Sequence, residues 1–108
     1  MAYLEVDDTD FQQILDEEFQ KGQIVILKFY TELCDACMAL DMELEDVDDE
    51  NEHVSVLAID CNECEYTANR FNVVQVPTMV IMKDATTTLL HKEGVMLSQD
   101  IEEIINQG

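Results

Sequence analysis

Residues 24–40 constrain the fold of this chain more than any other stretch. They begin with a run of mostly apolar, β-branched and aromatic residues, Ile24–Tyr30, which predicts a buried strand. A Cys-x-x-Cys motif, Cys34 and Cys37, follows a few residues later and opens a segment with helical spacing of apolar residues. The motif is therefore predicted to lie where a strand passes into a helix.

This position gives the two cysteines different chemical properties. Cys34 falls at or beside the helix N-terminus, where unpaired backbone N–H groups and the helix dipole stabilise a thiolate. Cys37 lies one turn further along, within reach of a mixed disulfide formed at Cys34. We therefore expect a reactive dithiol, and the rest of the chain as its scaffold.

Length and composition limit the fold and the partners. With 108 residues, the chain is long enough for one domain with a modest core, and a hydrophobic fraction of 47% is ordinary for a globular protein. Five Lys and Arg against twenty-five Asp and Glu give a formal charge of −20. This charge argues against nucleic acids and anionic membranes as partners, because both would be repelled. It fits a basic partner, a salt-rich cytosol or simply solubility.

The N-terminal residues show no targeting segment. They lack a basic region followed by an apolar stretch, and no apolar run approaches the ~20 residues that a membrane span needs. We therefore expect a cytoplasmic protein. In a reducing cytosol, a Cys-x-x-Cys motif indicates catalysis or metal binding more often than a structural disulfide.

Hydrophobic periodicity predicts strands and helices in the order βαβαβαββα. The predicted strands are Tyr3–Val6, Ile24–Tyr30, Val54–Asp60, Met79–Lys83 and Thr86–His91. The predicted helices run from Phe11 to Lys21 with a cap at Asp8, Thr9 or Asp10, from Cys34 to Glu50, from Glu63 to Phe71, and onward from a cap at Ser98. In the second helix, we expect Asp41 and the other acidic residues to face solvent. This order implies a three-layer α/β sandwich with a parallel core and an antiparallel flank.

Three motifs together resemble the thioredoxin family. Residues 29–37 are similar to the active-site segment of thioredoxins, residues 76–78, Val-Pro-Thr, to their cis-proline loop, and Gly94 with Ser98 to the glycine and cap before their last helix. The resemblance covers nearly the whole chain. It implies a single thioredoxin-like domain, residues 1–108, folded as a three-layer α/β/α sandwich with a central mixed sheet.

The resemblance also implies thiol–disulfide exchange with protein substrates. Cys34 matches the exposed attacking cysteine, Cys37 the resolving one, and Pro77 the residue whose cis peptide bond lies beside an extended substrate. A separate electron donor of the thioredoxin-reductase type is implied as a second partner. We expect a monomer without a cofactor. The residues expected to contact substrate are Leu33, Asp35, Val76, Pro77 and Gly94.

Two departures from the family pattern, a dipeptide and a single residue, concern the dithiol. Asp35-Ala36 replaces the usual Gly-Pro, and at ~6 Å the charge of Asp35 opposes a Cys34 thiolate by ~0.7–3 kcal/mol. The helix terminus contributes ~0.3–2 kcal/mol in the opposite direction, so the net effect stays open. Lys28 stands where thioredoxins usually carry a buried acid that helps to deprotonate the resolving cysteine. We expect Lys28 either to take part in catalysis, as a proton acceptor or as a charge beside Cys37, or to extend to solvent and be inert.

Cys61 and Cys64 form a second Cys-x-x-Cys motif that also follows a predicted strand and opens a predicted helix. Adjacent parallel strands would bring both cysteine pairs to one edge of the sheet. Three roles stay open for the second pair. It forms an auxiliary disulfide that modulates the first pair, it completes a four-cysteine zinc site, or Cys64 packs into the core as a small hydrophobic residue.

Two functions fit these observations. The first is an enzyme, a thioredoxin-like reductase of protein disulfides that uses Cys34 and Cys37. The second is a redox-weak binding or regulatory module of the same fold, with or without a bound metal, in which Asp35-Ala36 and Lys28 have weakened the reducing power.

Overall fold

The computed structural model describes residues 2–107 as five strands and four helices in the predicted order. The strands are β1 (Ala2–Val6), β2 (Ile24–Tyr30), β3 (Val54–Asp60), β4 (Thr78–Asp84) and β5 (Thr87–Glu93). The helices are α1 (Phe11–Gln20), α2 (Asp35–Glu50), α3 (Glu65–Arg70) and α4 (Ser98–Gln107). The predicted bounds of β2 and β3 are confirmed, whereas α3 is shorter than the sequence predicted.

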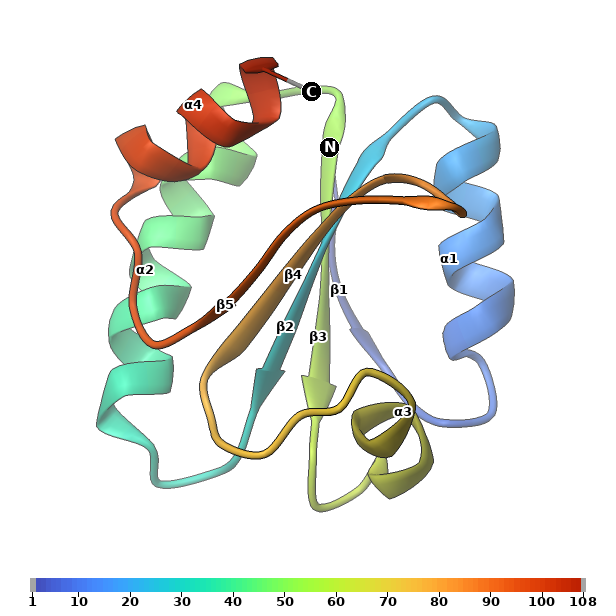
Figure 1. Cartoon of the computed structure of the whole chain (residues 1–108), viewed down its shortest axis with the longest axis vertical. Coiled ribbons are helices and arrows are strands. Elements are labelled where there is room, and N and C mark those ends of the chain that lie inside the picture. Colours follow the sequence, from blue (N-terminus) through green and yellow to red (C-terminus); the bar gives the residue numbers. More distant parts are fainter. Residues whose placement is uncertain (1, 108) are drawn as a thin grey trace.

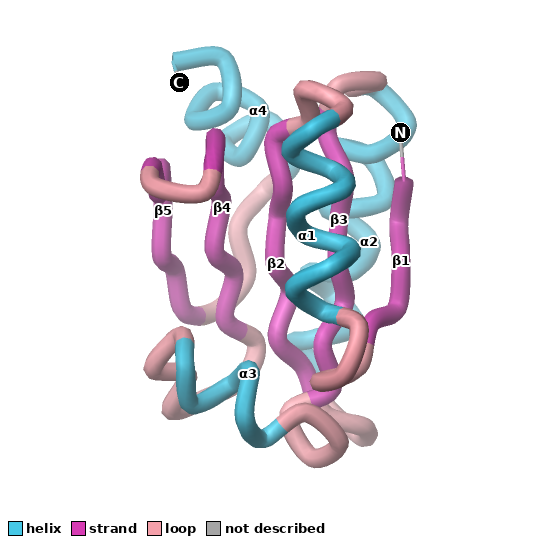
Figure 2. Tube along the Cα trace, turned by 90° about the vertical axis from the view of Figure 1, so that its right-hand side faces the viewer, coloured by secondary structure: helices cyan, strands magenta, loops and turns pink. Residues whose placement is uncertain are grey.

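The five strands form one mixed sheet in the order β1-β3-β2-β4-β5. β1, β3 and β2 run parallel, and β4 and β5 are antiparallel to their neighbours, as predicted (Figure 2). The last residues of β2 and β3, Tyr30 and Asp60, lie in register. The backbone N–H of Cys61 donates to the carbonyl of Tyr30 at 2.9 Å. Both cysteine motifs therefore begin at the same edge of the sheet.

Helices cover both faces of the sheet, with α2 and α4 on one side and α1 and α3 on the other (Figure 1). Side chains of β2 alternate between the two cores, because successive residues of a strand point to opposite faces. Val25, Leu27 and Phe29 pack against α1 and α3, while Ile26 packs against α2 and α4. Burying each such side chain contributes about 1.5–3 kcal/mol. The same alternation directs Lys28 toward α2.

Helix α2 connects the cysteine motif to the core. It packs through the predicted stripe of buried residues, Cys37, Leu40, Leu44 and Val47. The prediction that Asp41 faces solvent is wrong, because this carboxylate is partly buried and paired with Lys28. Within residues 2–107, no helix combines the length and the hydrophobicity needed to cross a membrane.

The acidic loop before α1 provides a side-chain cap for α3, through Asp8, instead of the one predicted for α1. Asp10 is the N-cap residue of α1, but its carboxylate accepts a hydrogen bond from the Asp7 N–H instead of from the helix. The carboxylate of Asp8 accepts hydrogen bonds from the backbone N–H groups of Tyr66 and Thr67, at 3.2 and 3.0 Å. Asp8 therefore caps α3, a contact between segments far apart in the sequence.

Candidate active site

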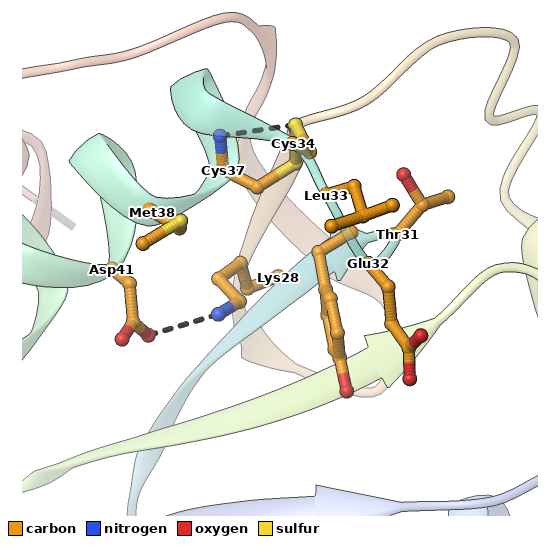
Figure 3. Close-up of a pocket in the computed structure, with 9 residues that line it drawn as sticks. Lys28, Thr31, Glu32, Leu33, Cys34, Cys37, Met38 and Asp41 are labelled. Carbon is orange, nitrogen blue, oxygen red and sulfur yellow. Dashed lines mark hydrogen bonds and ion pairs between the residues drawn. A yellow bond between two sulfur atoms is a disulfide. The ribbon is translucent and has the colours of Figure 1, made fainter.

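Cys34 and Cys37 form a disulfide at the N-terminus of α2 (Figure 3). Their Cα atoms are 5.2 Å apart, within the usual range for a disulfide. Cys34 is the N-cap residue of α2, and its Sγ accepts a hydrogen bond from the Cys37 backbone N–H at 3.1 Å. An N–H group of the first helical turn is thus directed at the sulfur that carries negative charge after reduction.

The two sulfurs differ in their access to solvent. Cys37 is 3% exposed, whereas Cys34 is only partly buried. Leu33, directly before Cys34, is fully exposed and has a φ of +57°, in the left-handed region that leucine rarely adopts. This backbone conformation directs an apolar side chain into solvent beside the accessible sulfur.

The Val76–Pro77 peptide bond is cis, as the resemblance implied. Gly94 donates its N–H to the carbonyl of Pro77 at 2.9 Å, and its φ of +89° is one that glycine adopts without strain. The hydroxyl of Thr78 donates to the carbonyl of Gln75 at 2.7 Å. These two hydrogen bonds fix the proline loop at both ends.

Two pockets adjoin at Thr31. The first, of about 230 Å³, lies beside the disulfide and is lined by both of its cysteines and by Lys28 and Asp41. The second, of about 250 Å³, is lined by Cys61 and by the segment 73–76, which contains three valines. Because Thr31 lines both pockets, the pocket of the disulfide and the pocket of the proline loop are neighbours.

Lys28 is buried in the first pocket and paired with an acid from α2. Its Nζ lies 2.8 Å from Oδ1 of Asp41, and the two side chains are 8% and 35% exposed (Figure 3). The hydroxyl of Tyr3 donates to the same carboxylate oxygen, and the Lys28 ammonium lies 4.7 Å from the centroid of the Tyr30 ring. The prediction that Lys28 extends to solvent is therefore wrong, and its part in catalysis stays a prediction.

Burial changes the proton affinity of both partners in this pair. Desolvation lowers the pKa of Lys28, and the negative charges of Glu5 and Glu45 oppose that shift. Desolvation, followed by the charge of Glu45, raises the pKa of Asp41. Sequence reasoning missed Asp41. A signal existed, since Asp41 follows Cys37 by one helical turn and so borders the buried stripe of α2.

The second cysteine pair lies at the same sheet edge, as predicted, but both of its members are free thiols. Cys64 is the N-cap residue of α3, so the helix begins after the second cysteine of the motif instead of after the first. Cys64 is 2% exposed, and burial, followed by the charges of Asp8 and Asp60, raises its pKa to about 11. Burial and Asp60 also raise the pKa of Cys61.

These findings separate the three roles left open for the second pair. Within residues 2–107, no three His, Cys, Asp or Glu side chains are arranged to hold a metal ion, so the zinc interpretation is not supported. The burial of Cys64 agrees with its packing as a small hydrophobic residue. The auxiliary disulfide between Cys61 and Cys64 stays a prediction.

A disulfide at a helix N-terminus, beside a cis-proline loop on a mixed sheet, defines a thiol–disulfide oxidoreductase. Known proteins agree. The thioredoxin family model matches residues 2–107. The chain is 25% identical to the thioredoxin of Bacillus subtilis over 108 residues, 99% of this chain and 98% of the relative. It is 26% identical to the thioredoxin of Echinococcus granulosus over 70 residues, 65% of each chain.

Solved structures lead to the same family. A chloroplastic thioredoxin z superposes with a TM-score of 0.85 at 28% identity, covering 99% of this chain and 94% of that one. The chain belongs to the thioredoxin family. It is a protein-disulfide reductase, and the alternative of a redox-weak binding module is not favoured.

Proposed function

We propose that Cys34 attacks disulfides of protein substrates and that Cys37 resolves the resulting mixed disulfide. The Cys34 thiolate attacks one substrate sulfur and releases the other as a thiolate. Cys37 then attacks the Sγ of Cys34, releases the second substrate sulfur and closes the Cys34–Cys37 disulfide. The substrate gains two electrons, and the dithiol of the protein loses them.

The observation that carries this proposal is the difference between the two sulfurs. Cys34 is the more accessible and accepts the Cys37 N–H at the start of α2, which favours its thiolate. Cys37 is buried, so a bulky protein disulfide reaches Cys34 first. Lys28 lines the same pocket, and as an ammonium it stabilises a thiolate at Cys37.

The proposed substrate surface surrounds the disulfide. Leu33, in the pocket of the disulfide, and Val76, in the neighbouring pocket, offer apolar contacts, and Pro77 supports an extended substrate segment. Gly94 acts indirectly, since its N–H holds the Pro77 carbonyl. Asp35 is exposed next to Cys34 and disfavours acidic substrate segments there.

The proposal also covers the setting of the reaction. A separate donor of the thioredoxin-reductase type returns two electrons to the disulfide after each turnover, and no bound cofactor is needed. We propose that the protein works in the cytoplasm as a monomer. Its formal charge of −20 supports the monomer, because like charges oppose self-association.

A trap for the mixed disulfide tests these roles. In Cys37→Ser the resolving thiol is absent, so we expect substrates to accumulate as covalent adducts on Cys34 that dithiothreitol releases. The matched control is the double variant Cys34→Ser with Cys37→Ser, which should capture none. Adducts that form equally in the control, or wild-type protein without insulin reductase activity in dithiothreitol, would contradict the proposal.

The predicted auxiliary disulfide between Cys61 and Cys64 requires its own test. Titration of thiols in a series of redox buffers should give two midpoints, one for each cysteine pair. Cys61→Ser should remove one midpoint and keep that of Cys34 and Cys37. A single two-electron midpoint in the wild-type protein would show that the second pair is not a redox centre.

A further inference from the structure

The Cys37 thiol needs a proton acceptor, a role for which the sequence offered Lys28. To attack a mixed disulfide, Cys37 must lose its proton, yet this residue is 3% exposed and has little contact with bulk water. In thioredoxins, according to the resemblance above, a buried acid on the preceding strand assists this step. Here that strand position holds Lys28, and the acid paired with it, Asp41, belongs to α2.

Asp41 has the right position on α2. It follows Cys37 by four residues, so the two side chains lie on the same helix face about one turn apart. The Asp41 carboxylate points to the Lys28 ammonium, 2.8 Å away, so a proton from Cys37 must reach it through water in the pocket (Figure 3). Both residues line the pocket of about 230 Å³ beside the disulfide (Figure 3). This volume has room for a bridging water, which occupies about 30 Å³ in the liquid.

Lys28 is poorly suited to accept the proton. Its Nζ contacts the Asp41 carboxylate and lies 4.7 and 5.6 Å from the ring centroids of Tyr30 and Tyr3. Burial lowers the pKa of Lys28, but the carboxylate, both aromatic faces and the negative charge of Glu5 oppose that shift and favour the ammonium form. An ammonium group has three donors and no free lone pair.

We propose, on the basis of the resolving role proposed for Cys37, that Asp41 is the proton acceptor for the Cys37 thiol. The proton leaves Cys37 Sγ through a bridging water and binds the Asp41 carboxylate, while the sulfur attacks Cys34 Sγ and the bond from Cys34 to the substrate sulfur breaks. Asp41, 35% exposed, then releases the proton to solvent. Lys28 and Tyr3 are positioning residues that hold the carboxylate.

A proton acceptor and a simple charge predict opposite effects for Asp41→Asn. If Asp41 acted only through its charge, removing that charge would stabilise the Cys37 thiolate and speed the second step. If Asp41 accepts the proton, the same substitution slows that step. The sign of the change therefore separates the two roles.

The experiment measures both steps in one reaction of the reduced protein with 5,5′-dithiobis(2-nitrobenzoic acid). Attack by Cys34 releases the first coloured thiolate and resolution by Cys37 releases the second. Every variant and its reference carry Cys61→Ala, so that this thiol does not react. For Asp41→Asn we expect the rate of the first phase to change less than about twofold. The rate of the second phase should fall by about 10- to 100-fold at pH 7, where the larger value equals the smallest contribution typical of a general base.

The pH dependence of the second-phase rate provides another test, because it would not change if Asp41 had only a structural role. In the reference protein the rate of the second phase should fall at low pH as Asp41 becomes protonated. This fall, the acid limb of the profile, should disappear in Asp41→Asn. Tyr3→Phe removes a hydrogen bond to the carboxylate and should shift the limb to higher pH, because such a bond favours the charged form. Asp46→Asn removes the same charge from an exposed position of α2 and should leave the profile unchanged.

Three results would overturn the role of Asp41. These are a faster second phase in Asp41→Asn, equal slowing of both phases, or an unchanged acid limb. If Asp41→Asn does not fold, Tyr3→Phe decides, and an unmoved limb counts against the proposal. A reference protein that shows no second phase would instead refute the resolving role of Cys37.

Discussion

The two Cys-x-x-Cys motifs follow neighbouring strands at the same sheet edge, yet only the first is joined as a disulfide. The difference lies in where the helix begins relative to each motif. In the first, the leading residue, Cys34, is the N-cap of α2. In the second, the trailing residue, Cys64, is the N-cap of α3, and Cys61 lies outside the helix. Relative to its motif, α3 thus begins three residues later than α2.

The groups that bind the two helix starts add to this difference. At α2, the N–H of Cys37 donates to the sulfur of Cys34. At α3, the backbone N–H groups of Tyr66 and Thr67 donate to the carboxylate of Asp8, and the negative charge of this carboxylate raises the pKa of Cys64. Cys34 therefore accepts a hydrogen bond from the first turn of its own helix, whereas at α3 the carboxylate of Asp8 accepts the corresponding hydrogen bonds.

Exchanging the nucleophile for serine gives the largest expected contrast between the motifs. Cys34→Ser should reduce insulin-reducing activity to the background rate of dithiothreitol, since a hydroxyl does not replace a thiolate as the attacking group. Cys64→Ala, at the N-cap of the other motif, should retain activity close to wild type. The assay is insulin precipitation, with thermal unfolding to confirm that both variants fold. Comparable losses in the two variants would mean that the motifs are not functionally distinct.

Alkaline pH should destabilise the protein through Cys64. Its pKa is about 11 in the folded protein, against an ordinary value of 9.0. The folded-state pKa is raised, so stability is full below pH 9 and falls as the pH rises toward 11, where only the unfolded chain has lost the proton. Between pH 8 and 10.5 we expect a loss of about 2 kcal/mol from this group.

Urea unfolding of the disulfide form measures this loss. Other groups also titrate in this range, so the quantity to compare is the difference between the wild-type protein and Cys64→Ala, which lacks the thiol. The variant should lose less stability between the two pH values. An equal loss would mean that the Cys64 thiol ionises as easily in the folded protein as in the unfolded chain.

Removing the acid that caps α3 should make the second motif more like the first. Asp8→Ala removes the acceptor for two backbone N–H groups and for the Thr67 hydroxyl and should therefore lower the free energy of unfolding. It also removes a negative charge that raises the pKa of Cys64, so alkylation of this thiol by iodoacetamide should become faster. Urea unfolding and mass spectrometry measure the two effects. The exposed Asp49, near the C-terminal end of α2, provides the control Asp49→Ala, in which neither should occur.

Local patterns predicted most of the fold. The bounds of β2 and β3 were correct because both are short, buried, apolar runs, and the stripe on α2 followed from helical periodicity. The start of α3 was not predicted, since the cap that fixes it, Asp8, lies 58 residues from Tyr66 in the sequence. Single-sequence periodicity does not contain such contacts.

The candidate site also has one part that the sequence predicted and one part that it did not. The disulfide of Cys34 and Cys37 followed from one continuous segment, whereas the partner of Lys28 did not. Asp41 belongs to an acidic run that resembles a solvated helix face, and only the packing of α2 against β2 brings it to Lys28. An ion pair between a strand and a helix depends on tertiary structure, so residue spacing alone did not identify it.

The smallest expected effect concerns the negative charge inside the first motif. Asp35 is exposed beside Cys34, so water and salt screen its charge, and the lower end of the Coulomb estimate applies, about 0.7 kcal/mol at ~6 Å. Asp35→Asn should therefore increase alkylation of Cys34 in the reduced protein by about threefold at pH 6, where the rate follows the thiolate fraction. The increase should shrink in 1 M salt, because the Debye length falls to about 3 Å. A rate that stays constant in both salt conditions would show that the start of α2, and not the charge at position 35, determines the reactivity of Cys34, and the contrast with the acid-bound start of α3 would then depend on helix frame alone.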